Sequence, residues 1–194
     1  LPRPPRLPRP WAPTRFQGFP PQRRMFIQDA TEWPIARPSD RDDQRACYSG
    51  KHKDHTLKTL IVIDEHLTIR LATPLVVGRC HDKRLADETG YTLPSGSELL
   101  QDLGFQGFDV EGVVIIQPHK KPPKGVLSEE QKATNRAIAS RRVRVEHVIG
   151  SVKRYRVVKE RLRLWSEGIA DLLMSICCGL HNWRIHLSPW KPLR

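Results

Sequence analysis

Residues 55–64 read HTLKTLIVID, and residues 68–77 read TIRLATPLVV. Both runs are rich in β-branched and other apolar residues, and only Glu65, His66 and Leu67 separate them. That spacing is typical of a β-hairpin, in which two antiparallel strands are joined by a short turn. The hairpin decides the fold class, because the other expected elements must then be arranged around it.

Further elements are expected on both sides of this hairpin. Met25–Ile27 is a strand candidate that ends at Asp29, whereas the polar stretch from Pro34 to Asp43 is expected to be loop. The remaining expected elements are a short helix over 81–89, apolar strands at 99–100 and 113–116, a long helix from Ser128 to about Leu162, and a last helix over 169–187. This order predicts an α/β domain with a mixed sheet and flanking helices.

The start of the long helix carries its own signal. Ser128 is followed three residues later by Gln131, which is the arrangement of a capping box. The last helix ends before Pro189, which cannot continue it.

Composition places the chain among basic intracellular proteins. Its 194 residues include 33 Lys and Arg against 21 Asp and Glu, a net charge of +12. This length suits one domain, and the charge makes nucleic acid the first partner to consider and an anionic membrane surface the second. The longest apolar stretch, 169–180, is too short to span a bilayer, and no signal sequence is recognised. We therefore expect no membrane association and a location in the cytoplasm.

Cysteine usage fits the same compartment. Cys47, Cys80, Cys177 and Cys178 show no paired spacing that indicates a disulfide framework. A zinc site is disfavoured, because no Cys-x-x-Cys pair accompanies these residues and the nearby histidines.

The first 24 residues differ in composition from the rest. They hold 8 of the 17 prolines and 6 arginines but no acidic residue. Such a segment lacks both backbone donors and apolar side chains, so we expect an extended, disordered tail. The expected organisation is a tail over 1–24, a catalytic domain over 25–187 and a C-terminal tail over 188–194.

Three acidic residues stand where a carboxylate is costly unless it is paired, hydrogen-bonded or bound to metal. Asp29 ends an apolar run, Asp102 lies between apolar residues and a glycine, and Glu146 lies among valines in the long helix. Each taken alone is most often a solvated or salt-bridged acid. Together, at the ends of neighbouring strands and on a helix behind them, they predict a divalent-metal site, because hard carboxylate oxygens suit Mg²⁺ or Mn²⁺.

Glu146 shares its helix face with basic residues. Arg142 lies four residues before it and Lys153 seven after, so all three are near one face at 3.6 residues per turn. Such a face would hold phosphodiester oxygens beside the metal. The alternative is a simple ion pair between Arg142 and Glu146, worth only about 0.3–0.5 kcal/mol.

A series of motifs runs in order from Met25 to Leu187 without a large gap. They are Asp29-Ala-Thr-Glu32, Arg37-Pro38, Tyr48-Ser-Gly-Lys-His-Lys-Asp-His-Thr-Leu-Lys58, Gly78-Arg-Cys-His-Asp82, Asp102-Leu-Gly-Phe-Gln-Gly107, Leu127-Ser128, Asn135-Arg136, RVRVEHVIGSVK over 142–153, and Gly179-Leu-His-Asn182. With these motifs the chain resembles the DDE catalytic domain of bacterial insertion-sequence transposases, in the division related to the eukaryotic Harbinger transposases. The resemblance implies a ribonuclease-H-like fold and DNA cutting and joining with two Mg²⁺ or Mn²⁺ ions.

Carried over by motif, the resemblance implies a catalytic triad of Asp29, Asp102 and Glu146. Asp82 is a further acid at or near the metals, and Arg142 and Lys153 match the basic positions that flank the glutamate. The chain departs from the family at Ala139, where relatives have tyrosine, and more mildly at Phe105. The upstream helix-turn-helix region that would recognise transposon ends is not found in this sequence.

The second triad acid is open between two residues. Asp102 follows an apolar strand and precedes Gly104, so we expect it at the carboxyl end of a strand beside Asp29. Asp82 opens a short helix, where a carboxylate also serves as a cap. Asp102 is therefore the preferred assignment.

A basic segment precedes and enters the first strand of the hairpin. Lys51, Lys53, His55 and Lys58 are expected to contact the phosphate backbone of DNA rather than base edges. A solvated basic hairpin is an equally good reading of these four residues.

The sequence thus predicts the catalytic domain of a DNA transposase that cleaves and transfers strands. Its partners would be transposon ends and target DNA near the bacterial nucleoid, and a second copy of the chain in a homodimer. Two alternatives are a DNA-binding remnant without activity and a structure-specific endonuclease with the same metal site.

Overall fold

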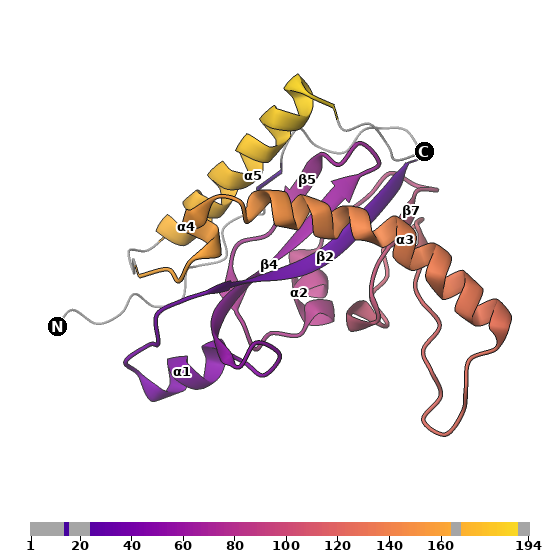
Figure 1. Ribbon diagram of the computed structural model, residues 1–194, viewed down its shortest axis with the longest axis horizontal. Helices are drawn as coiled ribbons and strands as arrows, with labels where there is room; N and C mark the ends of the chain where they lie inside the picture. Colours follow the sequence, from indigo (N-terminus) through magenta and orange to yellow (C-terminus); the bar gives the residue numbers. More distant parts are fainter. Residues whose placement is uncertain (1–13, 16–23, 164–167, 190–194) are drawn as a thin grey trace.

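A computed structural model of the chain describes residues 14–15, 24–163 and 168–189, and Figure 1 shows the arrangement of its elements. The strands are β1 (Thr14–Arg15), β2 (Met25–Pro34), β3 (Tyr48–Ser49), β4 (Asp54–Asp64), β5 (Ile69–Ala72), β6 (Val76–Val77), β7 (Glu98–Leu100) and β8 (Val114–Ile116). The helices are α1 (Arg41–Cys47), α2 (Asp82–Thr89), the 3₁₀ helix η1 (Leu103–Phe105), α3 (Glu129–Val152), α4 (Arg156–Lys159) and α5 (Ile169–Leu187).

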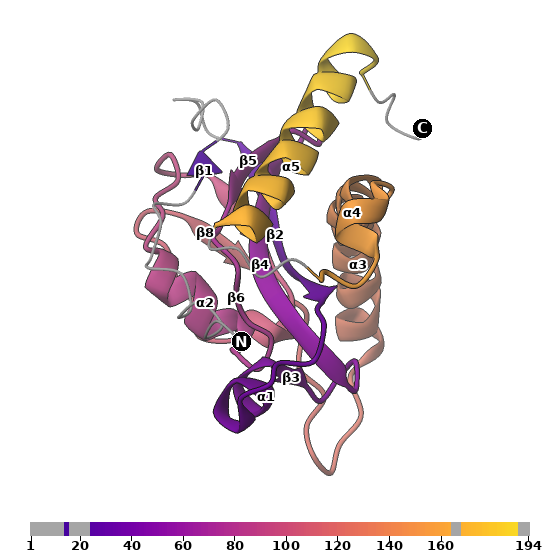
Figure 2. The same ribbon diagram turned by 90° about the vertical axis from the view of Figure 1, so that its left-hand side faces the viewer.

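The sheet is mixed, and its centre is the long strand β4. The strand order is β1-β5-β4-β2-β7-β8, and β3 and β6 also pair with β4. Pairs β2–β4 and β4–β5 are antiparallel, whereas β2–β7 and β7–β8 are parallel. Helices cover both faces, with α2 on one side and α3, α4 and α5 on the other (Figure 2). This arrangement confirms the expected α/β class and is consistent with a ribonuclease-H-like fold.

The predicted hairpin is confirmed in β4 and β5. Ile61 pairs with Ala72 and Val62 with Leu71, and a bulge follows at Val62 and Ile63. The turn between the strands is held by the buried carboxylate of Asp64, which accepts hydrogen bonds from the backbone of His66 and Thr68. The apolar run therefore continues to the end of β4, where one acid closes the turn.

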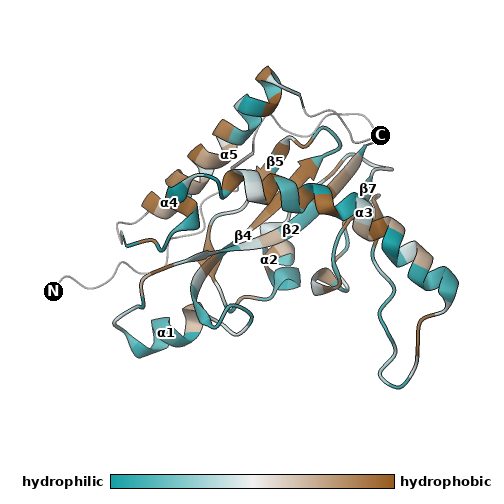
Figure 3. Cartoon of the chain, viewed as in Figure 1, coloured by the Kyte–Doolittle hydropathy of each residue, from teal (hydrophilic) through white to brown (hydrophobic). Residues whose placement is uncertain are grey.

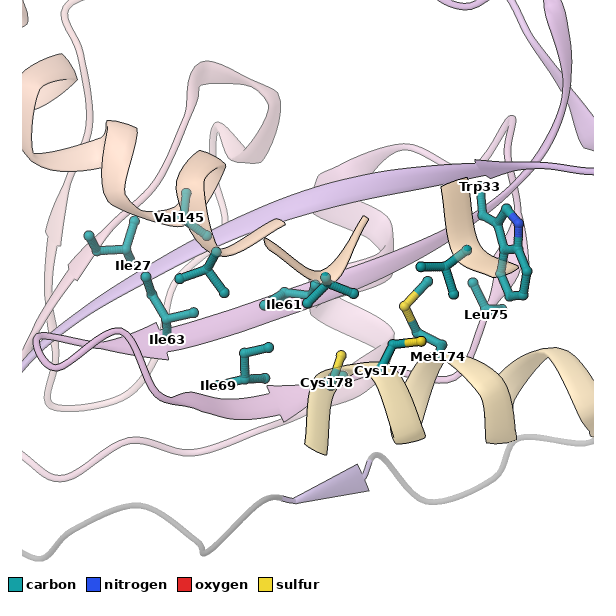
Figure 4. Packing of buried hydrophobic residues seen from close by; sticks show 14 of the residues in the cluster. Ile27, Trp33, Ile61, Ile63, Ile69, Leu75, Val145, Met174, Cys177 and Cys178 are labelled. Carbon is teal, nitrogen blue, oxygen red and sulfur yellow. The ribbon is translucent and has the colours of Figure 1, made fainter. Parts of the chain in front are cut away.

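Strand β4 is buried on both faces, which explains its unbroken apolar sequence. Ile61 and Ile63 face a core shared with α3 and α5, in which Val145, Met174 and Cys178 also lie (Figure 4). The alternate residues Leu60 and Val62 face a second core beneath α2, which includes Phe26, Leu71, Leu85, Leu99 and Phe105. Figure 3 shows that the central strands are apolar, whereas α1 is mostly hydrophilic.

Strand β2 is longer than the sequence predicts. It pairs with β4 from Phe26 to Pro34, so Asp29 lies in the middle of the strand and does not end it. The prediction that the strand ends at Asp29 was wrong, because partner strand β4 supplies hydrogen bonds along the polar residues Ala30–Glu32 as well. The site acid therefore stands on a rigid central strand.

The predicted loop after β2 contains a helix. In α1 the side chain of Asp40 caps the helix by accepting hydrogen bonds from the backbone of Asp42 and Asp43. A seven-residue polar helix with one buried residue, Cys47, gives no apolar period to recognise in the sequence.

The long helix ends earlier than predicted. The capping box at Ser128 and Gln131 is confirmed, but α3 ends at Val152 and a separate short helix, α4, follows. The segment after α4 is bound to the end of β2: Trp33 donates to the carbonyl of Glu160, and the backbone of Leu162 donates to that of Pro34. The last helix, in contrast, has the predicted bounds.

The ends of the chain lie partly outside the described residues. Of the predicted tail over 1–24, Thr14 and Arg15 form β1 and pair with Ala72 and Leu71 of β5, and Arg24 is also described. Residues 190–194 of the predicted C-terminal tail are not described. Within the described ranges, the helices are all too short or too polar to cross a membrane.

Candidate active site

A cavity of about 670 Å³ opens where β2, the β3–β4 turn, the segment before α2 and helix α3 meet. It brings together residues that lie far apart in the sequence. The acids that line it are Asp29, Glu32, Asp82 and Glu146, and the bases are Lys51, His52, Lys58, Arg79, His81 and Lys153. Opposite charges therefore share one open site at one end of the sheet.

Asp29 is the most buried of the three proposed triad acids. Its side chain is 22% exposed, and one carboxylate oxygen accepts a hydrogen bond from the backbone of Ala30. Burial raises the pKa of Asp29 to about 6, the cation of Arg142 opposes that rise, and the charges of Asp102 and Asp82 add to it. The shift follows from a carboxylate placed among others in a partly dry site, a pattern found at functional centres.

Arg142 lies between two of the acids. Its Nη2 is 3.9 Å from Oδ2 of Asp29, and its Nη1 is 3.4 Å from Oδ1 of Asp102. Its side chain is largely buried, and its Nε has no hydrogen-bond partner. Among the described residues Arg142 forms no ion pair with Glu146, so the guanidinium instead bridges two strands of the sheet.

Asp102 occupies the strand-end position that the sequence predicts. It follows β7, whose Leu100 pairs in parallel with Ile27 of β2. Its carboxylate accepts a hydrogen bond from the backbone of Leu103 and caps η1. Half of the side chain is exposed, so one face of this acid is open to solvent and to a ligand.

Asp82 is held by a buried lysine. Its Oδ1 lies 2.9 Å from Nζ of Lys58, which also donates to the carbonyl of Cys80 at 2.6 Å. Gly104 packs against the same carboxylate, since a Cβ there would stand 2.9 Å from Oδ2. The alternative reading of Asp82 as the cap of α2 is wrong, because His81 is the cap residue and no side chain caps this helix.

Lys58 has a different position from the one expected for a phosphate contact. The residue is 8% exposed, and its ammonium lies 3.7 Å from Glu32 in addition to its bonds with Asp82 and Cys80. No sequence pattern indicated this burial, because Lys58 lies in the same basic run as Lys51 and Lys53. Those two are exposed in the β3–β4 turn, and His55 is half-buried.

Glu32 is a cavity residue that sequence reasoning did not assign. It accepts a hydrogen bond from the hydroxyl of Thr56 at 2.7 Å, and its side chain is 9% exposed. Its backbone carbonyl accepts a bond from Nζ of Lys153, whose pKa is lowered by burial. The sequence signal that could have identified Glu32 as a site residue was its position in the Asp29–Glu32 motif.

Glu146 is exposed on α3 and faces the cavity together with Ile149 and Gly150. As they stand, no three acids, histidines or cysteines among the described residues are grouped closely enough to hold a metal ion. The donor chemistry nevertheless suits Mg²⁺ or Mn²⁺, because the candidate ligands are all carboxylates. A positive charge already lies between Asp29 and Asp102 in the form of Arg142, which is further support for a cation there.

Residues 28–182 match the family of DDE superfamily endonucleases. A probable transposase for insertion sequence element IS702 from Microchaete diplosiphon is 31% identical over 170 residues, which is 88% of this chain and 60% of that protein. This chain thus spans less than two thirds of that relative's length. No solved structure gave a significant match. Neither match addresses the Harbinger-related division.

Proposed function

The chain belongs to the DDE superfamily endonucleases, and from that premise we propose that it acts as a transposase of the insertion-sequence type, which cleaves DNA and transfers strands at transposon ends with divalent metal ions. The observation that carries this proposal is the acid-lined cavity in which Asp29 on β2 and Glu146 on α3 face one site. Asp102 is tied to the same place by its shared contact with Arg142.

Asp29, Asp102 and Glu146 would hold the metal. When bound, two Mg²⁺ or Mn²⁺ ions supply activation of the attacking hydroxyl and stabilisation of the leaving oxygen. Asp29 stands within the central strand β2, so its backbone would be held in place on both sides of this ligand. Arg142 holds the charge of Asp29 and Asp102 in the metal-free chain and would be free to contact a DNA phosphate when a cation replaces it.

Asp102 is the preferred second acid. The charge of Asp102 raises the pKa of Asp29 more than the charge of Asp82 does. Asp102 and Asp29 also share the contact with Arg142. Asp82 is already ion-paired to the buried Lys58. We assign Asp82 to orienting the metal ligands from the edge of the site, while Lys58 keeps the carboxylate of Asp82 in place.

DNA contacts would come from basic residues around the cavity. Lys51 and Lys53 lie in the exposed β3–β4 turn, and His55 is the second residue of β4. On α3, Lys153 lines the cavity and Arg142 lies beside Asp29. These cations would bind phosphates and position the strand without reading its sequence. The proposed partners are transposon ends and target DNA in the bacterial cytoplasm, and a second copy of the chain.

The test is cleavage of a supercoiled plasmid and of a labelled transposon-end duplex with Mg²⁺, Mn²⁺ or EDTA. We expect nicking with metal only, and its loss in Glu146→Gln, whose amide keeps the shape but removes the charge. Far-UV circular dichroism checks that the variant is folded, and Glu130→Gln, an exposed acid in the first turn of the same helix, is the matched control.

The products distinguish the alternatives. Joining of the labelled end to target DNA supports a transposase, whereas metal-dependent nicking without joining supports a structure-specific endonuclease. Binding without nicking in any metal supports an inactive remnant. Equal cleavage by Glu146→Gln and the parent chain in Mn²⁺ would contradict the site assignment.

A further inference from the structure

A second cavity, of about 680 Å³, adjoins the acid-lined one. Its walls are Arg41, Gln44, Arg45, Tyr48, Gly50 and Arg79, named here the arginine pocket. Tyr48, Gly50 and Arg79 also line the acid-lined cavity, so the two cavities border each other along these three residues. The cleavage chemistry proposed above uses none of the six residues.

The arginine pocket is held together by a close backbone contact. Gly78 lies so near β4 that a Cβ would stand 2.0 Å from the hydroxyl and 2.7 Å from the carbonyl oxygen of Thr56. The next residue, Arg79, donates its backbone N–H to the carbonyl of Ala46 in α1 at 3.2 Å. The chain thereby fixes Arg79 beside α1, where Arg41 and Arg45 lie one turn apart.

The positive charge of this pocket is weakly compensated. Arg45 has an exposed contact of 3.8 Å with Asp42, in which both side chains are more than three quarters exposed. In the described part of the chain, Arg41 and Arg79 have no ion-pair partner. Contacts as open as that of Arg45 with Asp42 are worth about 0–1 kcal/mol. The guanidinium groups are therefore available for an anion, and their planar donors match a phosphate.

An aromatic ring stands between the arginines and the catalytic acids. Tyr48 is 44% exposed, and its one described ring contact is edge-on, with His55 at a centroid distance of 5.7 Å and an angle of 71°. An exposed tyrosine ring beside basic side chains is the arrangement that stacks on a base of single-stranded DNA. Away from the ends of a duplex both faces of each base are covered by its neighbours, so there this ring can stack only on an unpaired base.

We propose, on the basis of the proposed function, that the arginine pocket binds an unpaired nucleotide of the strand that enters the acid-lined cavity. Arg41, Arg45 and Arg79 contact the phosphates, and Tyr48 stacks on the base. Because Tyr48, Gly50 and Arg79 border both cavities, the bound nucleotide adjoins the phosphate presented to the acids. The preferred substrate is therefore a DNA end with a single-stranded extension rather than a blunt duplex.

The test measures binding by fluorescence anisotropy in EDTA, with the full chain and two labelled DNAs of equal phosphate number, one blunt and one with a four-nucleotide overhang. We expect the parent chain to bind the overhang DNA about tenfold more tightly. Tyr48→Ala should remove this preference and Tyr48→Phe should keep it, because stacking needs the ring and not the hydroxyl. The double variant Arg41→Gln with Arg45→Gln should bind about tenfold more weakly and lower the salt dependence by about two released counterions.

Arg156→Gln is the matched control, since Arg156 is exposed on α4 and lines neither cavity. Equal binding of both DNAs by the parent chain, or an overhang preference that survives in Tyr48→Ala, would overturn the proposal. Should Tyr48→Ala fail to fold, Arg79→Gln must instead reduce overhang binding more than Arg156→Gln does. Binding in EDTA requires no cutting, so loss of nicking with an intact overhang preference would count against the proposed function alone.

Discussion

Two carboxylate–arginine assemblies in this sheet differ in how completely their hydrogen bonds are satisfied. At the β4–β5 turn, buried Asp64 accepts bonds from the backbone of His66 and Thr68 and from Nε and Nη2 of Arg70, all between 2.7 and 3.0 Å. Beside the acid-lined cavity, which Asp29 lines but Arg142 and Asp102 do not, Arg142 reaches its two acids only at 3.4 and 3.9 Å, and its Nε is buried without a partner.

The difference indicates which assembly is structural and which is functional. A buried charge with every bond made stabilises one conformation, and removing its partner is costly. A loosely held charge with an unpaired donor has gained little from folding, so a ligand can rearrange it at small cost. Asp64 and Arg70, named here the turn assembly, fix the hairpin. Arg142 with Asp29 and Asp102, named here the cavity assembly, is ready to exchange its guanidinium for another cation.

The largest expected effect is on catalysis in the cavity assembly. Asp102→Asn should abolish nicking, a loss of at least about 10³-fold, because one ligand charge is removed. Asp82→Asn should keep measurable nicking and raise the Mg²⁺ concentration needed for half-maximal rate. Plasmid nicking at graded Mg²⁺ measures both. If Asp82→Asn were the inactive variant and Asp102→Asn the metal-sensitive one, the two roles would be reversed.

The next effect is on stability and falls on the turn assembly. Asp64→Asn should lower the free energy of unfolding by about 3–5 kcal/mol, since it leaves Arg70 largely buried without its charge partner. Asp102→Asn is the matched comparison and should change it by less than about 1 kcal/mol. Urea denaturation followed by circular dichroism gives both values. Similar losses in the two variants would mean that the assemblies do not differ in this way.

A smaller effect tests the exchange of cations directly. Arg142→Gln removes the guanidinium between Asp29 and Asp102, and the two like charges should then attract a metal ion more strongly. We expect Mn²⁺ to bind about tenfold more tightly in titration calorimetry without DNA. Arg144→Gln, two residues along the same helix, should bind Mn²⁺ as the parent does. Unchanged or weaker binding in Arg142→Gln would show that Arg142 does not compete with the metal.

The smallest effect concerns pH at the turn assembly. His181 bonds the carbonyl of Leu67 in that turn and the hydroxyl of Ser151, and burial lowers its pKa. The unfolded chain therefore binds a proton near pH 6.5 that the folded chain resists, so stability falls as pH drops below that value. His181→Gln should be less stable at pH 7.5 but lose about 1 kcal/mol less between pH 7.5 and 5.5. His186→Gln, exposed on the same helix, is the control, and equal pH slopes in His181→Gln and the parent would contradict the assignment.

Local patterns were sufficient for much of the fold. The hairpin, the capping box at Ser128 and the bounds of α5 all follow from residues close together in the sequence. The second half of β2 and the end of α3 did not, because each depends on a partner segment. Glu32 stays in a strand because Lys58 pairs with it in β4. Helix α3 ends at Val152, and beyond α4 the chain returns to bind the end of β2 through Glu160 and Leu162.

The candidate site divides in the same way. Asp102 could be placed because the carboxyl end of a strand is a local property, and Glu146 because helical spacing relates it to Lys153. The bridging position of Arg142 and the burial of Lys58 required distances between segments that no local pattern contains. Charge in the sequence showed where cations are numerous and not which of them are already paired.

The central position of β4 has a consequence for the chain during its synthesis. Strands β2 to β6 pair among themselves and are complete once residue 77 has been made, so this part of the sheet can form early. Parallel strand β7 and helix α3, which bring Asp102 and Glu146, are made later, at translation rates of about 5–20 residues per second. For several seconds the nascent chain would hold Asp29 on a nearly finished sheet without its companion acids. Chemical competence toward DNA is then among the last properties that the growing chain acquires.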